Sequence, residues 1–314
     1  MQDKFVVIGG AGFIGSHFVS ELLKGDNQVI VVDDYSSGFE NLLDEVSSSN
    51  NLKIIRLDVR FTNELIKFLS PDTTVIHLAS NPDIAAAALN PRIDFLNGTV
   101  LTESVAEASR IAGVKRILYA SGSGVYGEFK GKEFKESDML APISPYGASK
   151  LSGEALLSAY SNMFGITCTA FRFANVVGPN QTHGVGYDFI NKLKSNPNEL
   201  LILGDGTQSK PYIHVKDVVS AVLQTKNTHG KSFDVFNVST KDQVSVNEIA
   251  KIVIEQLNLS QLQIKVKYSG GPRGWSGDVP NVQLNTDKIT AGGWKPTLNS
   301  TEALMLSISE MSRI

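Results

Sequence analysis

The sequence predicts an α/β protein in which helices cover both faces of a parallel, doubly wound sheet. Short runs rich in β-branched residues alternate with longer segments of helical periodicity, a pattern typical of consecutive strand–helix–strand units. A glycine-rich stretch separates the first run from the first helical segment, where a Rossmann-type sheet binds a dinucleotide. The chain has 314 residues, 42% of them hydrophobic, which is enough for a sizeable core.

Six strands are expected in the first part of the chain, several of them apolar enough to be buried on both faces. They lie at residues 4–9, 28–32, 52–57, 73–78, 115–120 and 166–173. Two helices stand out, at residues 98–112 and 146–164. Each is followed by a glycine, Gly113 or Gly165, as is common where a helix ends.

The alternation weakens after about residue 178, where polar turns, single strands and short helices follow. We therefore expect a dinucleotide-binding Rossmann domain over residues 1–177 and a smaller α+β substrate-binding domain over residues 178–314. A segment near residues 211–240 is expected to return to the first domain.

Composition argues against several classes of partner. A net charge of -3 argues against a broad basic face for nucleic acid or an anionic membrane. No segment approaches the roughly 18 to 20 apolar residues of a membrane helix, and the first strand begins too early for a signal peptide. The single cysteine, Cys168, lies in an apolar strand pattern and is expected in the core. These features predict a cytoplasmic protein.

The five histidines are scattered without the spacing of metal ligands, so no metal site is expected. They are His17, His77, His183, His214 and His229.

The glycine-rich stretch after the first strand is the most informative motif. Gly9 permits a tight turn, Gly12 lets the backbone approach a pyrophosphate, and Gly15 allows close packing of the helix. A glycine pattern alone also fits a turn without ligand, but the second strand ends in Asp33 and Asp34, where a dinucleotide fold places the carboxylate that binds adenosine ribose. A carboxylate there repels a 2′-phosphate, which favours NAD over NADP.

A second motif, Tyr146 and Lys150, opens the helix at 146–164. Residues at i and i+4 share one helix face. A lysine ammonium near a phenol favours the phenolate and so lowers the pKa of the tyrosine, which lets it act as a base near neutrality. Alone, this spacing usually marks an exposed amphipathic pair. Beside a dinucleotide loop it indicates a catalytic pair.

Taken together, these motifs resemble the extended short-chain dehydrogenase/reductase family, and within it the NAD-dependent nucleotide-sugar epimerases of the UDP-glucose (UDP-galactose) 4-epimerase type. The resemblance covers nearly the whole chain. It rests on Gly-Gly-Ala-Gly-Phe-Ile-Gly at 9–15, Leu-Asp-Val at 57–59, Ile-His-Leu-Ala at 76–79, Asn-Gly-Thr at 97–99, Val-Tyr-Gly at 125–127, Tyr146 to Lys150, Arg-Phe-Ala-Asn-Val-Val-Gly-Pro at 172–179, Gly-Asp-Gly-Thr-Gln at 204–208, Tyr-Ile-His-Val at 212–215 and Arg-Gly-Trp-Ser-Gly-Asp-Val-Pro at 273–280.

The resemblance implies which residues hold NAD. Phe13 and Ile14 would meet the pyrophosphate, residues 33–38 the adenosine, and Lys150 the nicotinamide ribose. Asn97 looks like the family's buried polar contact behind the cofactor, although a lone asparagine is more often a helix cap. The full set is Gly9, Gly12, Phe13, Ile14, Gly15, Asp33, Asp34, Tyr35, Ser36, Ser37, Gly38, Asp58, Val59, Leu78, Ala79, Ser80, Asn97, Ser121, Tyr146, Lys150 and Phe173.

The resemblance also implies a sugar-nucleotide site. Its diphosphate would be held by an asparagine, a lysine and an arginine, its ribose by an aspartate, and its base by a valine and a tyrosine. In that order these are Asn175, Lys210, Arg273, Asp278, Val185 and Tyr212, joined by Ser123, Tyr146 and Val282 at the sugar. Lys210-Pro211 stands where the family often has Arg-Asp, which keeps the charge but loses a bidentate fork.

The implied reaction is epimerisation at C4 through a transient 4-keto sugar. Tyr146 would remove the C4 hydroxyl proton while hydride passes to NAD. Return of the hydride to the opposite face of the ketone, with Tyr146 giving the proton back to the C4 oxygen, would then invert the carbon. One departure is Gly122, which occupies the position of the family's Ser or Thr that bonds the base and the sugar O4. We expect a neighbouring hydroxyl, Ser123 or Ser121, to take this role, with Ser123 favoured slightly.

Related reactions are disfavoured by the same loop. The family's 4,6-dehydratases carry an Asp-Glu pair just before Val-Tyr-Gly, where this chain has Ser123-Gly124. Hence UDP-glucose/UDP-galactose 4-epimerisation ranks first. The alternatives are another UDP-sugar epimerase acting on N-acetylhexosamines, or a non-catalytic NAD-binding or redox-sensing homologue, which Gly122 would suit.

Sugar selectivity and assembly are implied less directly. Val282 lies four positions beyond Asp278, where the resembling epimerases border the sugar C2 substituent, so its small side chain predicts room for an acetamido group. It could equally be only an apolar strand residue. The helices at 98–112 and 146–164 resemble those that pair in the family's homodimers. The candidate interface residues, which could instead serve the core, are Leu151, Ala155, Leu156 and Ala159.

Overall fold

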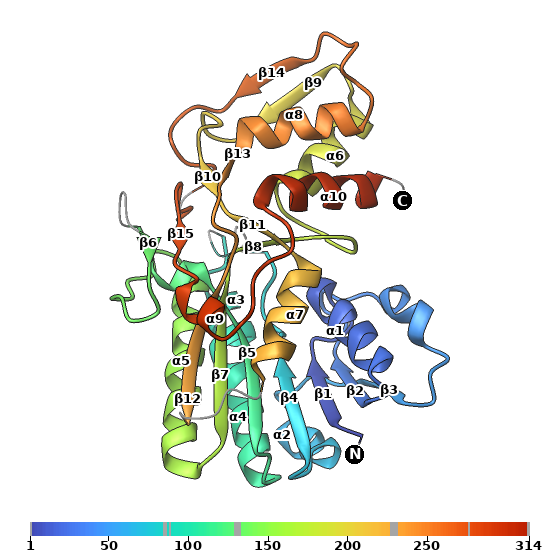
Figure 1. Ribbon diagram of the computed structural model, residues 1–314, viewed down its shortest axis with the longest axis vertical. Helices are drawn as coiled ribbons and strands as arrows, with labels where there is room; N and C mark the ends of the chain where they lie inside the picture. Colours follow the sequence, from blue (N-terminus) through green and yellow to red (C-terminus); the bar gives the residue numbers. More distant parts are fainter. Residues whose placement is uncertain are drawn as a thin grey trace.

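The central feature of the computed structural model is a parallel sheet (Figure 1). Residues 2–83, 87, 89–128, 133–226, 232–275 and 277–312 are described. Within these ranges the sheet has seven strands, in the order β12 (Phe233–Val238), β7 (Thr167–Phe173), β5 (Arg116–Gly122), β4 (Thr73–His77), β1 (Lys4–Ile8), β2 (Gln28–Asp33) and β3 (Leu52–Arg56). The α/β fold class and the six predicted strands are confirmed.

The strand order contains one topological switch point. β1 pairs with β2 on one side and with β4 on the other, so the chain winds outward in both directions from this pair. Ligands of such sheets bind outside the carboxyl ends of the strands at the switch point. The carboxyl ends face the smaller group of elements drawn above the sheet in Figure 1.

Helices cover both faces of the sheet because its strands alternate in the direction of their apolar side chains. On β1, Phe5 and Val7 pack in the same apolar cluster as residues of α1 (Phe13–Lys24) and α7 (Val215–Thr225). Val6 and Ile8 pack in a second cluster. That cluster includes residues of α2 (Thr62–Leu65), α4 (Leu101–Ile111) and α5 (Pro145–Phe164). Two 3-10 helices, η1 (Glu40–Val46) and η2 (Ile66–Phe68), complete the β2–β4 region.

The helix predicted at 98–112 begins earlier than the sequence indicated. Pro91 precedes α3 (Arg92–Asp94), which continues through a π-helical turn, η4 (Phe95–Val100), into α4. The π turn inserts an extra residue per turn, which breaks the apolar spacing used to find the helix start. The helix predicted at 146–164 is confirmed as α5, where the Ser144 hydroxyl accepts a hydrogen bond from the Gly147 amide at 3.1 Å.

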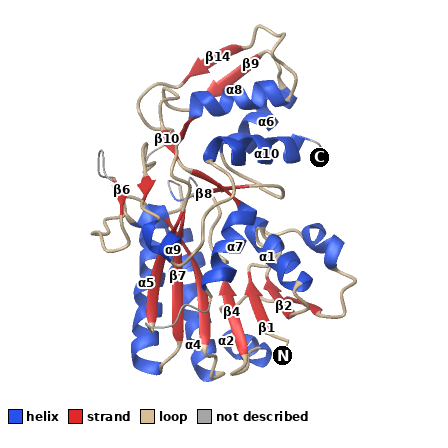
Figure 2. Cartoon of the chain, in the orientation of Figure 1, coloured by secondary structure: helices blue, strands red, loops and turns tan. Residues whose placement is uncertain are grey.

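The later elements divide between the sheet and a separate layer. β12 pairs with β7, and α9 (Asp287–Ala291) packs against β12. The separate layer surrounds a third apolar cluster. This layer contains α6 (Val185–Ser195), β9 (Glu199–Ile202), β10 (Ser209–Lys210), β13 (Val244–Ser245), α8 (Val246–Gln256), β14 (Lys265–Tyr268) and α10 (Ser300–Ser312), which are labelled in Figure 1 and, apart from β13, in Figure 2.

Two short pairs of strands run between these layers. β8 (Asn175–Val177) pairs with β11 (Tyr212–His214), and β6 (Glu133–Phe134) pairs with β15 (Gln283–Leu284). A division of the chain at residue 177 stays a prediction.

Three further observations concern the other expectations. Cys168 is fully buried in the sheet, as predicted. None of the helices in the described ranges combines the length and apolar character needed to cross a membrane. In the same ranges, no three His, Cys, Asp or Glu side chains gather as metal ligands; His229 lies outside them.

Candidate active site

The glycine-rich loop lies at the switch point, between β1 and α1. Gly9 has a φ of 80°, in the left-handed region, and a Cβ there would lie 2.7 Å from the Ala79 amide nitrogen. Gly12 caps α1, and in the described part of the chain no side chain bonds that helix end. The amides of the first turn, which begins with Phe13 and Ile14, are therefore available to an anion. These residues fit the pyrophosphate of a dinucleotide.

Asp33 joins this loop to the segment that follows β2. Its carboxylate accepts hydrogen bonds from the Ala11 amide and the Tyr35 amide, each at 2.9 Å. Burial raises the pKa of Asp33, and the two amides oppose this effect. Asp34 accepts a hydrogen bond from the Ser36 amide at 2.9 Å, while Ser37 is exposed and Gly38 is buried. The structure thus brings the predicted adenosine residues 33–38 against the glycine loop.

The next two predicted segments follow β4 and β3, which lie on opposite sides of the β1–β2 pair. Leu78 and Ala79 follow β4, and their amides donate to the Ile8 carbonyl at 2.9 and 3.1 Å, which keeps Leu78, Ala79 and the partly buried Ser80 beside the loop. Asp58 forms an ion pair with Arg60 at 2.7 Å, and the Arg60 hydrogen bonds lower the pKa of Asp58. Val59 is buried, and Phe173 is buried at the end of β7.

Asn97 differs from the expectation of a buried contact. Its side chain is only partly buried and accepts a hydrogen bond from Arg60 at 3.4 Å. Asp94, three residues earlier on the same helix, is a buried carboxylate, with 1% of its surface exposed. Asp94 was not predicted as a site residue, because the helix was expected to begin at residue 98. The π turn that follows Asp94 is a feature often found at functional sites.

The Tyr146 and Lys150 side chains lie on one face of α5. The Lys150 ammonium lies 5.6 Å from the centre of the Tyr146 ring and donates a hydrogen bond to the Ala120 carbonyl at 2.8 Å. Burial lowers the pKa of Lys150 to about 8, and burial followed by the Asp94 charge raises the pKa of Tyr146 to about 12. The chain's own groups therefore raise the tyrosine pKa, in the direction opposite to the predicted lowering, because desolvation disfavours the phenolate and the Asp94 charge adds to this effect.

Asp94 lies behind this pair. One carboxylate oxygen accepts a hydrogen bond from the Asn81 amide at 2.9 Å, and the other, also buried, has no hydrogen-bond partner in the described part of the chain. Burial raises the pKa of Asp94. Its charge acts on both catalytic candidates, raising the pKa of Lys150 and that of Tyr146.

Gly122 faces the Tyr146 hydroxyl. A Cβ on Gly122 would lie 3.9 Å from the Tyr146 oxygen and would meet no other atom of the described structure within 4 Å. Ser121 is unsuited to the predicted hydroxyl role, because its Oγ donates to Glu154 at 2.5 Å in the buried interior. Ser123 begins η5 (Ser123–Val125) and is partly exposed, with no hydrogen bond from its hydroxyl to any described residue. The role of Ser123 stays a prediction.

Three charged residues predicted for the sugar nucleotide lie together. Lys210 forms an ion pair with Asp278 at 2.5 Å, and Arg273 donates to the Asp278 carbonyl at 2.5 Å. Arg273 also pairs with Glu128, which follows the Val-Tyr-Gly motif. Ser276, part of the motif around Arg273, lies outside the described residues.

The remaining substrate candidates occupy two places. Asn175 pairs with Tyr212 between β8 and β11, and Val185 packs against the apolar cluster that contains Tyr212. Val282 belongs to the apolar cluster of the sheet and is only 6% exposed, which agrees with the alternative of a core residue. Its role as a gate stays a prediction.

These features define a dinucleotide-dependent α/β enzyme: a glycine loop at the switch point, an aspartate placed to bind the adenosine ribose, and a Tyr–Lys pair. A profile of the NAD dependent epimerase/dehydratase family matches residues 5–239. The chain belongs to this family, and NAD is its cofactor.

Individual relatives are nucleotide-sugar enzymes. A UDP-glucose 4-epimerase from Mycolicibacterium smegmatis is 33% identical over 254 residues, covering 78% of this chain and 80% of the relative. A solved UDP-galactose 4-epimerase has a TM-score of 0.88 and 35% identity, covering 99% of both chains. A UDP-N-acetylglucosamine 4-epimerase from Methanobrevibacter ruminantium M1, in complex with UDP-N-acetylmuramic acid, has a TM-score of 0.88 and 30% identity over the whole of both chains.

The GDP-mannose 3,5-epimerase 1 of Oryza sativa subsp. indica is also similar. It is 29% identical over 313 residues, covering 96% of this chain and 79% of the relative. The protein is therefore a nucleotide-sugar epimerase/dehydratase-type enzyme with NAD.

Proposed function

We propose that the protein is an NAD-dependent UDP-glucose/UDP-galactose 4-epimerase that works through a transient 4-keto sugar. The observation that carries the proposal is the Tyr146–Lys150 pair on α5, with the Tyr146 hydroxyl facing an open space at Gly122. Support also comes from the relatives and solved structures with 4-epimerase activity in their names.

The chain's own residues supply binding and proton transfer. Bound NAD supplies the hydride acceptor and donor. Tyr146 takes the proton of the C4 hydroxyl as the C4 hydrogen leaves with its electron pair, and it returns that proton after the ketone has turned over. Lys150 favours the phenolate and the developing oxyanion by its positive charge.

The cluster at Asp278 suits a sugar diphosphate. Lys210 and Arg273 bring two cations to one place, and Asn175 adds a side-chain amide on β8. We place the diphosphate on these three residues and the ribose on Asp278. Val185 and Tyr212, joined through one apolar cluster, would then flank the base.

The second candidate is epimerisation of a UDP-N-acetylhexosamine. It is favoured by the small side chain of Val282 and by the solved 4-epimerase in complex with UDP-N-acetylmuramic acid. Dehydration is disfavoured because Ser123 and Gly124 offer no acid or base at the positions of the Asp-Glu pair. A non-catalytic NAD-binding role is disfavoured by the intact Tyr146 and Lys150.

The test is incubation of the purified protein, without added NAD, with UDP-glucose, UDP-galactose, UDP-N-acetylglucosamine and GDP-mannose in separate reactions analysed by NMR. Interconversion of UDP-glucose and UDP-galactose supports the proposal. Conversion of the N-acetylated sugar alone favours the second candidate, and absence of any C4 inversion refutes both.

We also propose a homodimer formed through α4 and α5. Ala155 and Ala159 are exposed on α5, together with Met163, which is 77% exposed. Exposed apolar residues that gather on one helix are typical of a contact with a second chain. Sedimentation of the wild type and of an Ala155→Glu variant at equal concentrations tests this, since a monomeric wild type contradicts it.

A further inference from the structure

Helix α5 carries a third functional candidate on the face that holds the catalytic pair. Tyr146, Lys150 and Glu154 are spaced four residues apart, so they lie on successive turns of one face. Lys150 bonds the Ala120 carbonyl at 2.8 Å, and Glu154 accepts the Ser121 hydroxyl at 2.5 Å. Two consecutive residues at the end of β5, just before Gly122, are therefore fastened to α5.

A buried arginine holds Glu154 in this position. Arg172 on β7 donates to the two Glu154 oxygens, at 2.9 Å from Nε and 2.7 Å from Nη2. The side chains of Arg172 and Glu154 are 3% and 5% exposed. A bidentate pair of this kind fixes the orientation of both partners. Ser121 is also the register partner of Arg172 between β5 and β7.

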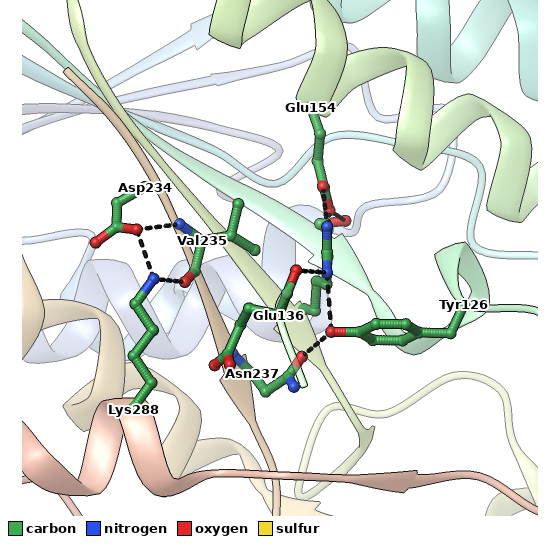
Figure 3. Close-up of polar contacts among 9 residues, drawn as sticks. Tyr126, Glu136, Glu154, Asp234, Val235, Asn237 and Lys288 are labelled. Atoms are coloured by element: carbon green, nitrogen blue, oxygen red, sulfur yellow. Dashed lines mark hydrogen bonds and ion pairs between the residues drawn. The ribbon is translucent and has the colours of Figure 1, made fainter. Parts of the chain in front are cut away.

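The other side of Arg172 fastens the loop after Gly122. Arg172 donates to the Tyr126 hydroxyl at 2.8 Å, and this hydroxyl donates to the Asn237 side chain on β12 at 2.7 Å. Figure 3 shows this chain of contacts from Glu154 to Asn237, with Glu136 beside it. The side-chain amide of Asn237 donates hydrogen bonds to the Phe134 and Asn285 carbonyls, at 2.9 and 3.0 Å. Ser121, Tyr126, Glu154, Arg172 and Asn237 are called the Glu154 network below.

We propose that the Glu154 network is a positioning device that sets the distance between the Gly122 segment and the Tyr146 hydroxyl. The network bonds Ser121 on one side of Gly122 and Tyr126 on the other, and both bonds lead to the helix that carries Tyr146. The inference rests on the proposed function for its kinetic consequence. Its structural content, that Glu154 and Arg172 hold the segment at 120–126, does not depend on the substrate.

The physical reason to expect positioning rather than stability is desolvation. Two buried charges lose their hydration, and a well-packed apolar pair of similar volume often stabilises a fold as well or better. A fully bonded polar network instead fixes a unique geometry. Displacement of a catalytic group by about 1 Å can cost a factor of about 10² in rate.

The test compares three variants with the wild type. Glu154→Gln removes the charge and keeps the shape, and the double variant Glu154→Leu/Arg172→Met removes both charges together. Glu64→Gln is the matched control, because Glu64 forms an exposed helical ion pair with Lys67 at 2.6 Å. The measurements are kcat and KM for the converted UDP-sugar, bound NAD, the thermal midpoint, and hydrogen exchange of the peptide that contains residues 119–127.

We expect Glu154→Gln to lower kcat about 10²-fold with KM changed less than threefold and NAD retained. In the double variant we expect the thermal midpoint to return towards the wild type while kcat stays low and exchange of residues 119–127 stays fast. A kcat that recovers with the midpoint would show a stability role only and overturn the inference. So would unchanged exchange relative to Glu64→Gln. If the wild type converts no sugar, the proposed function fails, and the exchange comparison alone decides whether the network holds the segment.

Discussion

A serine at position 122 is the sharpest probe of the candidate active site. Gly122 has extended backbone angles, φ −157° and ψ 165°, which any residue adopts. Among the described residues beyond its chain neighbours, an added Cβ would meet only the Tyr146 oxygen within 4 Å, at 3.9 Å. The serine Oγ extends one bond further and has three staggered positions. One of them can bring it within the roughly 2.5–3.0 Å of a hydrogen bond to the Tyr146 hydroxyl. The variant is expected to fold, because replacing glycine within an extended segment also removes chain entropy from the unfolded state.

The size of the effect follows from the cost of one missing donor. Loss of a single hydrogen-bond donor that acts in the transition state lowers kcat by about 10²- to 10³-fold. If this position is unfilled in the wild type, Gly122→Ser raises kcat by up to that factor. If Ser123 already supplies the hydroxyl, Gly122→Ser raises kcat little. Ser123→Ala then lowers kcat by about 10²- to 10³-fold.

The assay is the initial rate of C4 inversion of a saturating UDP-sugar, followed by NMR. Gly122→Ala is the matched control, since it fills the same space without a hydroxyl. The reasoning is refuted if the alanine and serine variants gain equally, or if both lose activity, because the space would then belong to the substrate. Full activity in Ser123→Ala together with no gain in Gly122→Ser would mean that no hydroxyl is required beside Tyr146.

Three further predictions test other parts of the site. Tyr146→Phe is expected to abolish turnover while NAD and UDP-sugar remain bound, and residual activity above a few per cent would reject Tyr146 as the acid/base group. Asp33→Ala is expected to weaken NAD binding in a fluorescence titration and to reduce discrimination against NADP, because ribose bonding, phosphate repulsion and the Ala11 contact are lost together; equal NAD and NADP affinity in the wild type would contradict this. Burial lowers the pKa of His77 to about 3. Below about pH 6.5 the unfolded chain therefore binds a proton on His77 that the folded chain does not bind, and the free energy of unfolding falls as pH drops from about 6.5 to about 3. Urea unfolding of His77→Asn is then expected to lose about 3 kcal/mol less than the wild type between pH 7 and 4.5, and parallel losses would refute the assignment.

The sequence predicted those parts of the fold that depend on local periodicity and turn chemistry. The glycine loop, the aspartate at the end of β2 and the capped helix α5 each carry their signal within a few residues. Asp94 was not predicted, because the π turn that follows it interrupts the apolar spacing that indicates the start of the helix. The Glu154–Arg172 pair joins a helix to a strand 18 residues away, and no local pattern distinguishes Glu154 from an exposed helical glutamate.

The electrostatics of Tyr146 likewise depend on long-range packing as well as on local spacing. The spacing of tyrosine and lysine indicated attraction and a lowered tyrosine pKa, but the size of that effect depends on burial, which spacing does not reveal. Burial and then the Asp94 charge raise the pKa of Tyr146 to about 12, and burial lowers that of Lys150 to about 8 against the opposing effect of Asp94. The largest cause of both shifts is the loss of water around a charge.

This burial has a consequence for proton transfer. In surroundings of low dielectric, a positive charge close to Tyr146 favours its phenolate more strongly than it would in water. If the nicotinamide ring, which is positively charged only in oxidised NAD, were held near Tyr146, the tyrosine would release its proton more readily in the oxidised than in the reduced holoenzyme. The tyrosine would then be a stronger base before the sugar is oxidised and would hold its proton more tightly afterwards. Because burial would amplify this difference, the residues that exclude water from Tyr146 would contribute, together with Lys150, to the acid/base role proposed for it.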